Sequence, residues 1–148
     1  MIKPWKLCLL TMGMLIGLTV SAFPEDTTRI HVTILTASNF GSDFNLENDA
    51  FRDQLLNLFS YTSYNQTDKF FIDLPRAKRQ SRTLPGGYEF ILTLQNKESG
   101  RILVQAVIRK GGQQYVDTVL SILNPGVVFL GGPPVEKGVL ILVLETGY

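Results

Sequence analysis

The strongest constraint on the fold comes from Val139-Leu140-Ile141-Leu142-Val143-Leu144, six consecutive apolar residues near the C-terminus. A strand with one face in water alternates apolar and polar side chains, whereas an uninterrupted apolar strand is covered on both faces. We therefore expect residues 139–144 to form an interior strand, with one face against a helix and the other against a curled-over strand or a second protein. Gly131-Gly132-Pro133-Pro134 precedes this strand as a turn, because proline cannot donate a hydrogen bond to a strand ladder.

The segments before this stretch do alternate, and they predict half-buried antiparallel strands. Polar and apolar residues alternate over residues 29–34 and again over residues 88–95. Residues 101–109 and 114–123 flank Gly111-Gly112, a strong hairpin signal because both glycines tolerate positive φ. Leu84-Pro85-Gly86-Gly87 and Asn124-Pro125-Gly126 read as further turns.

One helix is expected between the first strand and the others. Phe51, Leu55, Leu58 and Phe59 recur at helical spacing and form one apolar stripe, which we expect to face the sheet. Asp43 or Asn45 can cap the start of this helix.

Together these elements predict an α+β fold in which one amphipathic helix packs on a mostly antiparallel, curled sheet. The alternative is an all-β sandwich with one appended helix.

The N-terminal residues have the three parts of a secretory signal peptide. Lys3 and Lys6 form a positive start, residues 7–19 are mostly apolar and uncharged, and Val20 and Ala22 place small residues at a cleavage site. We expect residues 1–22 to be the signal peptide and residues 23–148 to be a single globular, strand-rich domain. The protein would then be exported, to the periplasm or outside the cell, with no transmembrane segment after cleavage. Retention of the signal as an anchor is the alternative.

The composition of residues 23–148 limits the classes of function. The single cysteine, Cys8, leaves with the signal peptide, so no disulfide is expected in the domain. Removing Lys3 and Lys6 leaves 12 of the 14 Lys and Arg residues against 13 Asp and Glu residues. A nearly neutral domain has no general electrostatic attraction for nucleic acid, which is therefore not an expected partner.

No motif indicates catalysis, a cofactor or a metal. His31 is the only histidine, and no cysteine or evident Asp–Ser pair accompanies it in a triad or a metal site. The P-loop, dinucleotide-binding and zinc-protease patterns do not occur. We therefore predict no catalytic residues, no cofactor-binding residues and no metal ligands.

One charge cluster is a candidate surface for an anion or a partner protein. It consists of Arg76, Lys78, Arg79 and Arg82, four cations within seven residues. The alternative interpretation is a solvated loop, since charge runs usually lie in water.

Three stretches carry a resemblance to a known group of sequences. They are Tyr61-Thr62-Ser63-Tyr64 after the helix, Leu84-Pro85-Gly86-Gly87, and Gly131-Gly132-Pro133 followed by Gly138-Val139-Leu140-Ile141-Leu142. In this order they resemble a family of small exported bacterial proteins. The resemblance implies an exported domain over most of residues 23–148, and it brings no activity with it.

The leading functional expectation is a non-catalytic protein of the bacterial cell envelope that binds or scaffolds another protein. It rests on the export signal, the lack of a catalytic constellation and the surplus of apolar strand surface. The partner would be an envelope protein or further copies of this chain. One alternative is a carrier of a small apolar ligand, with the same surplus lining a pocket. The other is a hydrolase that uses carboxylate chemistry.

Overall fold

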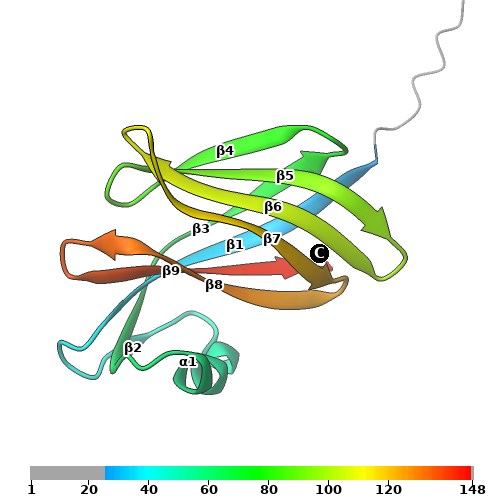
Figure 1. Ribbon diagram of the computed structural model, residues 1–148. Helices are drawn as coiled ribbons and strands as arrows, with labels where there is room; N and C mark the ends of the chain where they lie inside the picture. The colour runs from blue at the N-terminus through cyan, green and yellow to red at the C-terminus, as the bar shows by residue number, and fades with distance from the viewer. Residues whose placement is uncertain (1–25, 148) are drawn as a thin grey trace, which may run out of the picture.

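The computed structural model describes residues 26–147, so the predicted signal peptide lies outside the described residues. Nine strands and one short helical segment make up this part of the chain (Figure 1). The strands are β1 (Thr27–Ser38), β2 (Phe44–Asn45), β3 (Ser63–Pro75), β4 (Arg79–Leu84), β5 (Tyr88–Glu98), β6 (Arg101–Lys110), β7 (Gln113–Leu123), β8 (Gly126–Val135) and β9 (Gly138–Thr146). A 3-10 turn, Asp49–Phe51, leads into helix α1, Arg52–Leu58.

The strands form two sheets that face each other (Figure 1). The five-stranded sheet has the order β2-β3-β1-β9-β8, and the four-stranded sheet has the order β4-β5-β6-β7. Every pairing is antiparallel except that of the two-residue strand β2 with β3. The chain passes from the first sheet to the second between β3 and β4, and it returns between β7 and β8.

The main hydrophobic core lies between the two sheets. Alternate residues of each strand point into it, as the period of two along a strand requires. The five-stranded sheet contributes one face of β1 and β9, and the four-stranded sheet contributes the inner faces of β5 and β6. Its fully buried members are Ile30, Val32, Ile34, Leu74, Phe90, Leu92, Ile102, Val104, Ala106, Ile108, Ile122, Leu140, Leu142 and Leu144.

A second, smaller core lies on the outer face of the five-stranded sheet. Ile141 and Val143 of β9 point into it, and Phe51 and Leu55 of the helical segment cover them. The Phe51 ring meets the Phe129 ring of β8 edge-on, with ring centroids 5.7 Å apart. Strand β9 is therefore an interior strand buried on both faces, as its uninterrupted apolar sequence predicted. Its second face is covered by the other sheet of the same molecule.

The stripe predicted for the helix is correct at three of its four positions. Phe51 and Leu55 are buried and Phe59 packs against them, but the side chain of Leu58 is 60 % exposed. Leu58 is the last residue of the helix, so the short helix ends before it can bring this side chain against the sheet. The predicted caps are also wrong, because Asn48 accepts a hydrogen bond from the backbone N–H of Ala50 at the start of the segment.

The predicted fold class is right in its coarse features and wrong in its layering. The strands are mostly antiparallel and one helix is present, but they form two sheets instead of one curled sheet, which corresponds to the all-β sandwich alternative. The helical segment covers only part of one outer face (Figure 1). Among residues 26–147, the structure contains no helix with the length and apolarity needed to cross a membrane.

Two stretches predicted as turns or loops belong to strands. Gly131-Gly132-Pro133-Pro134 lies within β8, where the pairing with β9 shifts register between Gly131 and Pro134. The turn that brings the chain back follows at residues 136–137. The stretch before Leu84 is the edge strand β4, whose first five residues are exposed and so leave no apolar periodicity to read.

Candidate functional site

The four cations of the predicted basic patch do not share one surface. Arg76 and Lys78 lie between β3 and β4, while Arg79 and Arg82 lie on β4. In the register of β4 with β5, Arg79 is opposite Thr93 and Arg82 is opposite Phe90. Phe90 points into the core and Thr93 does not, so the two arginines project on opposite faces of the sheet. The structure therefore divides the predicted patch between a turn and the two faces of an edge strand.

Arg82 has a structural contact that closes one flank of the sandwich. Its guanidinium carbon lies 5.4 Å from the centre of the Phe70 ring on β3, and its Nη2 donates to the carbonyl oxygen of Phe71 at 3.4 Å. Phe70 is itself a partly buried member of the main core. An arginine from one sheet thus lies over the edge of the core and binds the backbone of the other sheet. We call this side of the sandwich, between β4 and β3, the closed flank.

The opposite flank lies between the edge strands β7 and β8. Figure 1 shows these two strands leaving their shared connection and diverging along their length. Four apolar side chains on this side are only partly buried against the main core, Val116 and Leu120 on β7 and Val128 and Val135 on β8. Thr118, opposite Ala106 in the ladder, points the same way and is also half-buried. We call these five residues the open flank, and none of them is charged.

Each end of the open flank is fastened by hydrogen bonds. At one end the hydroxyl of Tyr88 donates to the carbonyl oxygen of Pro134, and the ring of Tyr115 meets the Tyr88 ring edge-on. At the other end the Thr146 hydroxyl donates to the carbonyl oxygen of Leu123 at 2.6 Å. The two sheets are therefore held together at both ends of the flank, while the side chains between the ends remain partly exposed.

Strand β8 borders the open flank and has an unusual composition for an edge strand. None of its ten residues, Gly126–Val135, has a polar side chain. By contrast, the edge strand β4 contains two arginines, and the edge strand β7 contains Asp117. Pro133 and Pro134 interrupt the second half of β8, but residues 126–131 pair regularly with β9 and have no such protection.

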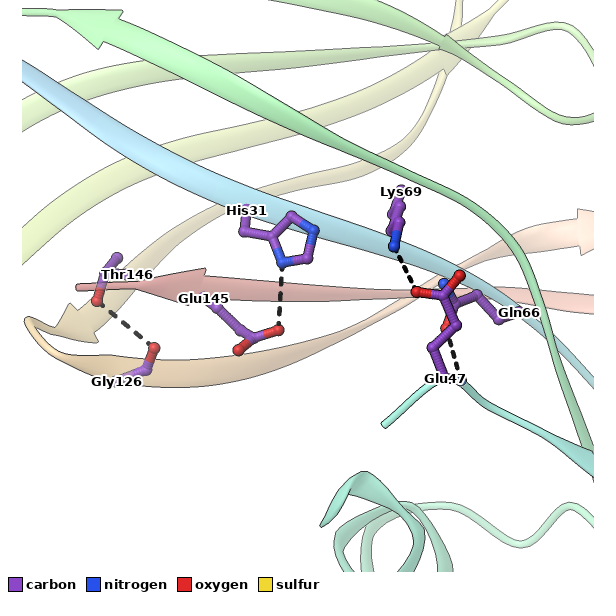
Figure 2. A network of polar contacts seen from close by, with 7 residues as sticks. All are labelled: His31, Glu47, Gln66, Lys69, Gly126, Glu145 and Thr146. Atoms are coloured by element: carbon purple, nitrogen blue, oxygen red, sulfur yellow. Dashed lines mark hydrogen bonds and ion pairs between the residues drawn. The ribbon is translucent and has the colours of Figure 1, made fainter. Parts of the chain in front are cut away.

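His31 and Glu145 form a polar pair on the outer face of the five-stranded sheet (Figure 2). They lie opposite each other on β1 and β9, with His31 Nδ1 3.5 Å from Glu145 Oε1, and each side chain is 16 % exposed. The imidazole stacks on the Phe71 ring with centroids 4.6 Å apart. This is the arrangement of a histidine that is packed and paired in a sheet face.

A second polar contact ties the segment before the helix to β3 (Figure 2). Lys69 Nζ binds the Glu47 carboxylate, and the backbone N–H of Glu47 donates to Gln66 Oε1 at 3.2 Å. The hydrogen bond from Lys69 lowers the pKa of Glu47 below its ordinary value, and His31 adds a smaller contribution in the same direction. Figure 2 also shows Thr146 beside the carbonyl of Gly126, at the fastened end of the open flank.

Two surface depressions of the described residues are lined largely by polar and charged groups, and a third, of about 390 Å³, includes Phe40 in a mainly apolar lining. One of the first two, of about 640 Å³, lies between the turn at Gly87 and the hairpin at Gly111-Gly112, beside the ion pair of Arg109 with Glu89. Another, of about 550 Å³, lies beside Glu47 and Lys69. Within residues 26–147 no group of three or more His, Cys, Asp or Glu side chains gathers as a metal site would require.

Comparison with known proteins identifies no relative of this chain. No protein-family model matches it, and neither the curated proteins nor the solved structures contain a significant match. The candidate site therefore rests on the geometry of the open flank and of β8.

Sequence reasoning missed this site and placed the apolar surplus elsewhere. The surplus inferred for residues 139–144 is covered within the molecule, by the helix on one face and by the four-stranded sheet on the other. Exposed or partly exposed apolar side chains remain on β7 and β8, and also at Phe40, Leu56, Leu58 and Phe71. The sequence signal for the site was the absence of polar residues over residues 126–135. Such a pattern predicts an interior strand, and only the strand order shows that β8 lies at an edge.

Proposed function

We propose that this protein is a non-catalytic, exported protein of the bacterial envelope that binds another protein along β8. The observation that carries the proposal is a ten-residue edge strand without one polar side chain. The backbone N–H and C=O groups of an edge strand are available to another chain, and natural proteins normally protect them with charges, prolines or a covering segment. Residues 126–131 contain no charged residue and no proline that could protect this edge in that way.

Two further observations support protein binding over the alternatives. The space between the sheets is filled by the side chains of the main core, which favours a rigid binding module over a carrier with an apolar cavity. His31 is engaged with Glu145 and Phe71, and this favours a structural role for the only histidine over carboxylate-dependent hydrolysis. The export of the protein rests on Lys3, Lys6 and the apolar residues 7–19.

Site-specific photo-crosslinking in cells tests the proposal. A photoreactive amino acid replaces Gly131, an exposed position on β8, and in a matched strain it replaces Ser81, an exposed position on the edge strand β4. We expect one defined protein adduct from position 131 and none from position 81. The adduct protein, once purified, should bind the unmodified chain with a measurable Kd.

A pair of charge variants completes this test. Gly131→Lys places a cation on the unprotected edge, at a position where an added Cβ meets only ordinary contact with Phe59 at 3.5 Å. Ser81→Lys adds the same charge to the edge that already contains arginines. Binding should fall for Gly131→Lys and persist for Ser81→Lys. Equal binding by both variants would show that β8 is not the binding edge.

A further inference from the structure

The two flanks of the sandwich differ in whether a side chain shields the apolar edge of the core from solvent. On the closed flank, Arg82 lies over Phe70 and binds the Phe71 carbonyl, so a long cationic side chain shields the apolar rim. On the open flank, the corresponding rim is formed by Val116, Leu120 and Val128. The inward-pointing residue between the two β7 members is Thr118, a half-buried residue with a short, uncharged side chain.

The open flank also combines two kinds of unsatisfied surface in one place. The first is the free backbone edge of β8 over residues 126–131. The second is the row of half-buried side chains that point toward the core from β7 and β8. A helix or a loop could cover the side chains, but only an extended segment pairs with the backbone edge at the same time.

We propose that an extended segment of the partner protein adds to β8 as a sixth strand of this sheet and completes the core at the open flank. The inference rests on the proposed function and deepens it by naming the partner chemistry. Alternate side chains of the segment would point inward against Val116, Leu120 and Val128, so these are apolar and preferably β-branched. The segment is uncharged where it pairs, because the flank residues offer no opposite charge.

The fastened ends of the flank set the length of this segment. The Tyr88–Pro134 hydrogen bond and the Thr146–Leu123 hydrogen bond hold the sheets together on either side. Regular pairing of β8 ends at Gly131, where its register with β9 shifts. The partner segment therefore pairs over about six residues, which is the usual length of a single strand.

Two substitutions on neighbouring residues of β7 separate this mode of binding from others. Thr118→Arg places on the open flank the kind of side chain that Arg82 provides on the closed flank. Val119→Arg adds the same residue on the opposite face of the same strand, where Val119 is 50 % exposed. A nine-residue peptide, acetyl-Lys-Thr-Val-Thr-Val-Thr-Val-Thr-Lys-amide with a fluorescent label, is the probe, and binding is measured by anisotropy.

We expect the unmodified protein to bind this peptide with a Kd below about 1 mM, as a single added strand without optimised contacts allows. Thr118→Arg should weaken binding by roughly tenfold or more, and Val119→Arg by less than about twofold. The same peptide with its three valines replaced by glutamate should not bind. Both protein variants are first compared with the parent by circular dichroism and Tm.

Amide hydrogen exchange on the unmodified protein gives a second measurement that does not depend on the variants. The peptide should slow exchange along residues 127–131 and leave the β4 amides unchanged. Protection at β4, or none at β8, would overturn the inference.

The outcome also separates this inference from the proposed function. If the partner crosslinks at position 131 but neither the peptide nor a peptide cut from the partner protects β8, the segment inference fails and protein binding stands. If the protein alone sediments as a dimer that Thr118→Arg converts to a monomer, the occupant is a second copy, and the inference of a different partner protein is overturned.

Discussion

The outer faces of the two sheets differ in whether another segment of the chain covers them. On the five-stranded sheet, the segment that contains Phe51 and Leu55 covers β9, so that Ile141 and Val143 are fully buried behind it. On the four-stranded sheet, the outer face has no such cover, and Val119 and Leu123 of β7 remain 50 % and 57 % exposed. The burial patterns reflect this difference, because residues 140–144 of β9 are all buried whereas every second residue of β7 between Tyr115 and Leu123 is exposed. Continuous apolarity therefore marks a strand with a layer on each side.

The largest effect is expected from charges placed in β9. Leu142 and Val143 are both fully buried, Leu142 between the sheets and Val143 under the helical segment. Leu142→Asp and Val143→Asp should each destabilise the domain by about 5 kcal/mol or more, comparable to its whole stability, because an unpaired carboxylate would be buried. Chemical denaturation followed by circular dichroism measures this, with Val119→Asp on the uncovered face as the control.

The two variants test separately whether each face of β9 is covered. If Val143→Asp folds as stably as Val119→Asp, the outer face of β9 is not covered and the helical segment contributes little. If Leu142→Asp also folds normally, the two sheets do not enclose a common core.

The next effect concerns the helical cover itself. Leu55→Ala removes a fully buried side chain and should lower the free energy of unfolding by about 2–5 kcal/mol, because it leaves a cavity between the helix and β9. Leu58→Ala is the matched control, since Leu58 is 60 % exposed and should change stability by less than about 0.5 kcal/mol. Urea unfolding of the two variants distinguishes a packed cover from a loosely attached helix, for which both effects would be small.

A smaller effect is expected from the hydrogen bond that joins the helix to β3. The hydroxyl of the fully buried Tyr64 donates to the carbonyl oxygen of Leu55 at 3.3 Å. Tyr64→Phe keeps the ring and removes this donor, so we expect a loss of about 1 kcal/mol. In the background of Leu55→Ala the loss should change measurably, because contacting residues are coupled. Additive effects in denaturation experiments would separate the hydrogen bond from the packing of the helix.

The smallest effect concerns the ion pair of Arg29 with Asp73, which lies on the outer face of the five-stranded sheet. Arg29 Nε donates to Asp73 Oδ1 at 2.8 Å, and this hydrogen bond holds the pKa of Asp73 below its ordinary value. A lowered pKa in the folded state stabilises the protein above the ordinary pKa, and the contribution is lost as the pH falls through the folded value. Stability should therefore decline below about pH 4.

The decline should be shallower in Asp73→Asn, as measured by Tm against pH. The double variant Arg29→Gln/Asp73→Asn should follow the Asp73→Asn curve, because the pair is already broken in the single variant. Because both side chains are about half exposed, solvent and salt weaken the pair and the difference should shrink in high salt. An unchanged curve for Asp73→Asn would assign the acid sensitivity to other carboxylates, such as Glu47 beside Lys69.

Much of the local structure could be predicted from residue patterns. The turns at Leu84-Pro85-Gly86-Gly87 and Gly111-Gly112 lie between β4 and β5 and between β6 and β7, because their glycines adopt the positive φ values that such turns require. The helical spacing of Phe51, Leu55 and Phe59 identified the buried face of the helical segment. Patterns failed where the side chains do not report their environment, as in β4, where exposed polar residues on both faces concealed a strand.

The candidate site could not be predicted in the same way. The cluster of Arg76, Lys78, Arg79 and Arg82 is contiguous in sequence, but the strand geometry sends Arg79 and Arg82 to opposite faces. The residues of the open flank are separated in sequence but lie on one side of the folded domain. Val116 and Leu120 come from β7 and Val128 from β8, and the packing of the two sheets places them along the same core.

The amino-acid sequence alone was sufficient to indicate most of the buried faces, because periodicity along a strand or helix records how many of its faces lie out of water. It could do so for β9, whose six apolar residues required cover on both sides. The packing of the two sheets was needed to show what supplies the cover and which strands lie at an edge. Residues 126–131 and 139–144 are similarly apolar, yet β9 lies between two strands and β8 has one neighbour. Strand order depends on contacts between segments far apart in the chain, and local side-chain patterns do not encode those contacts.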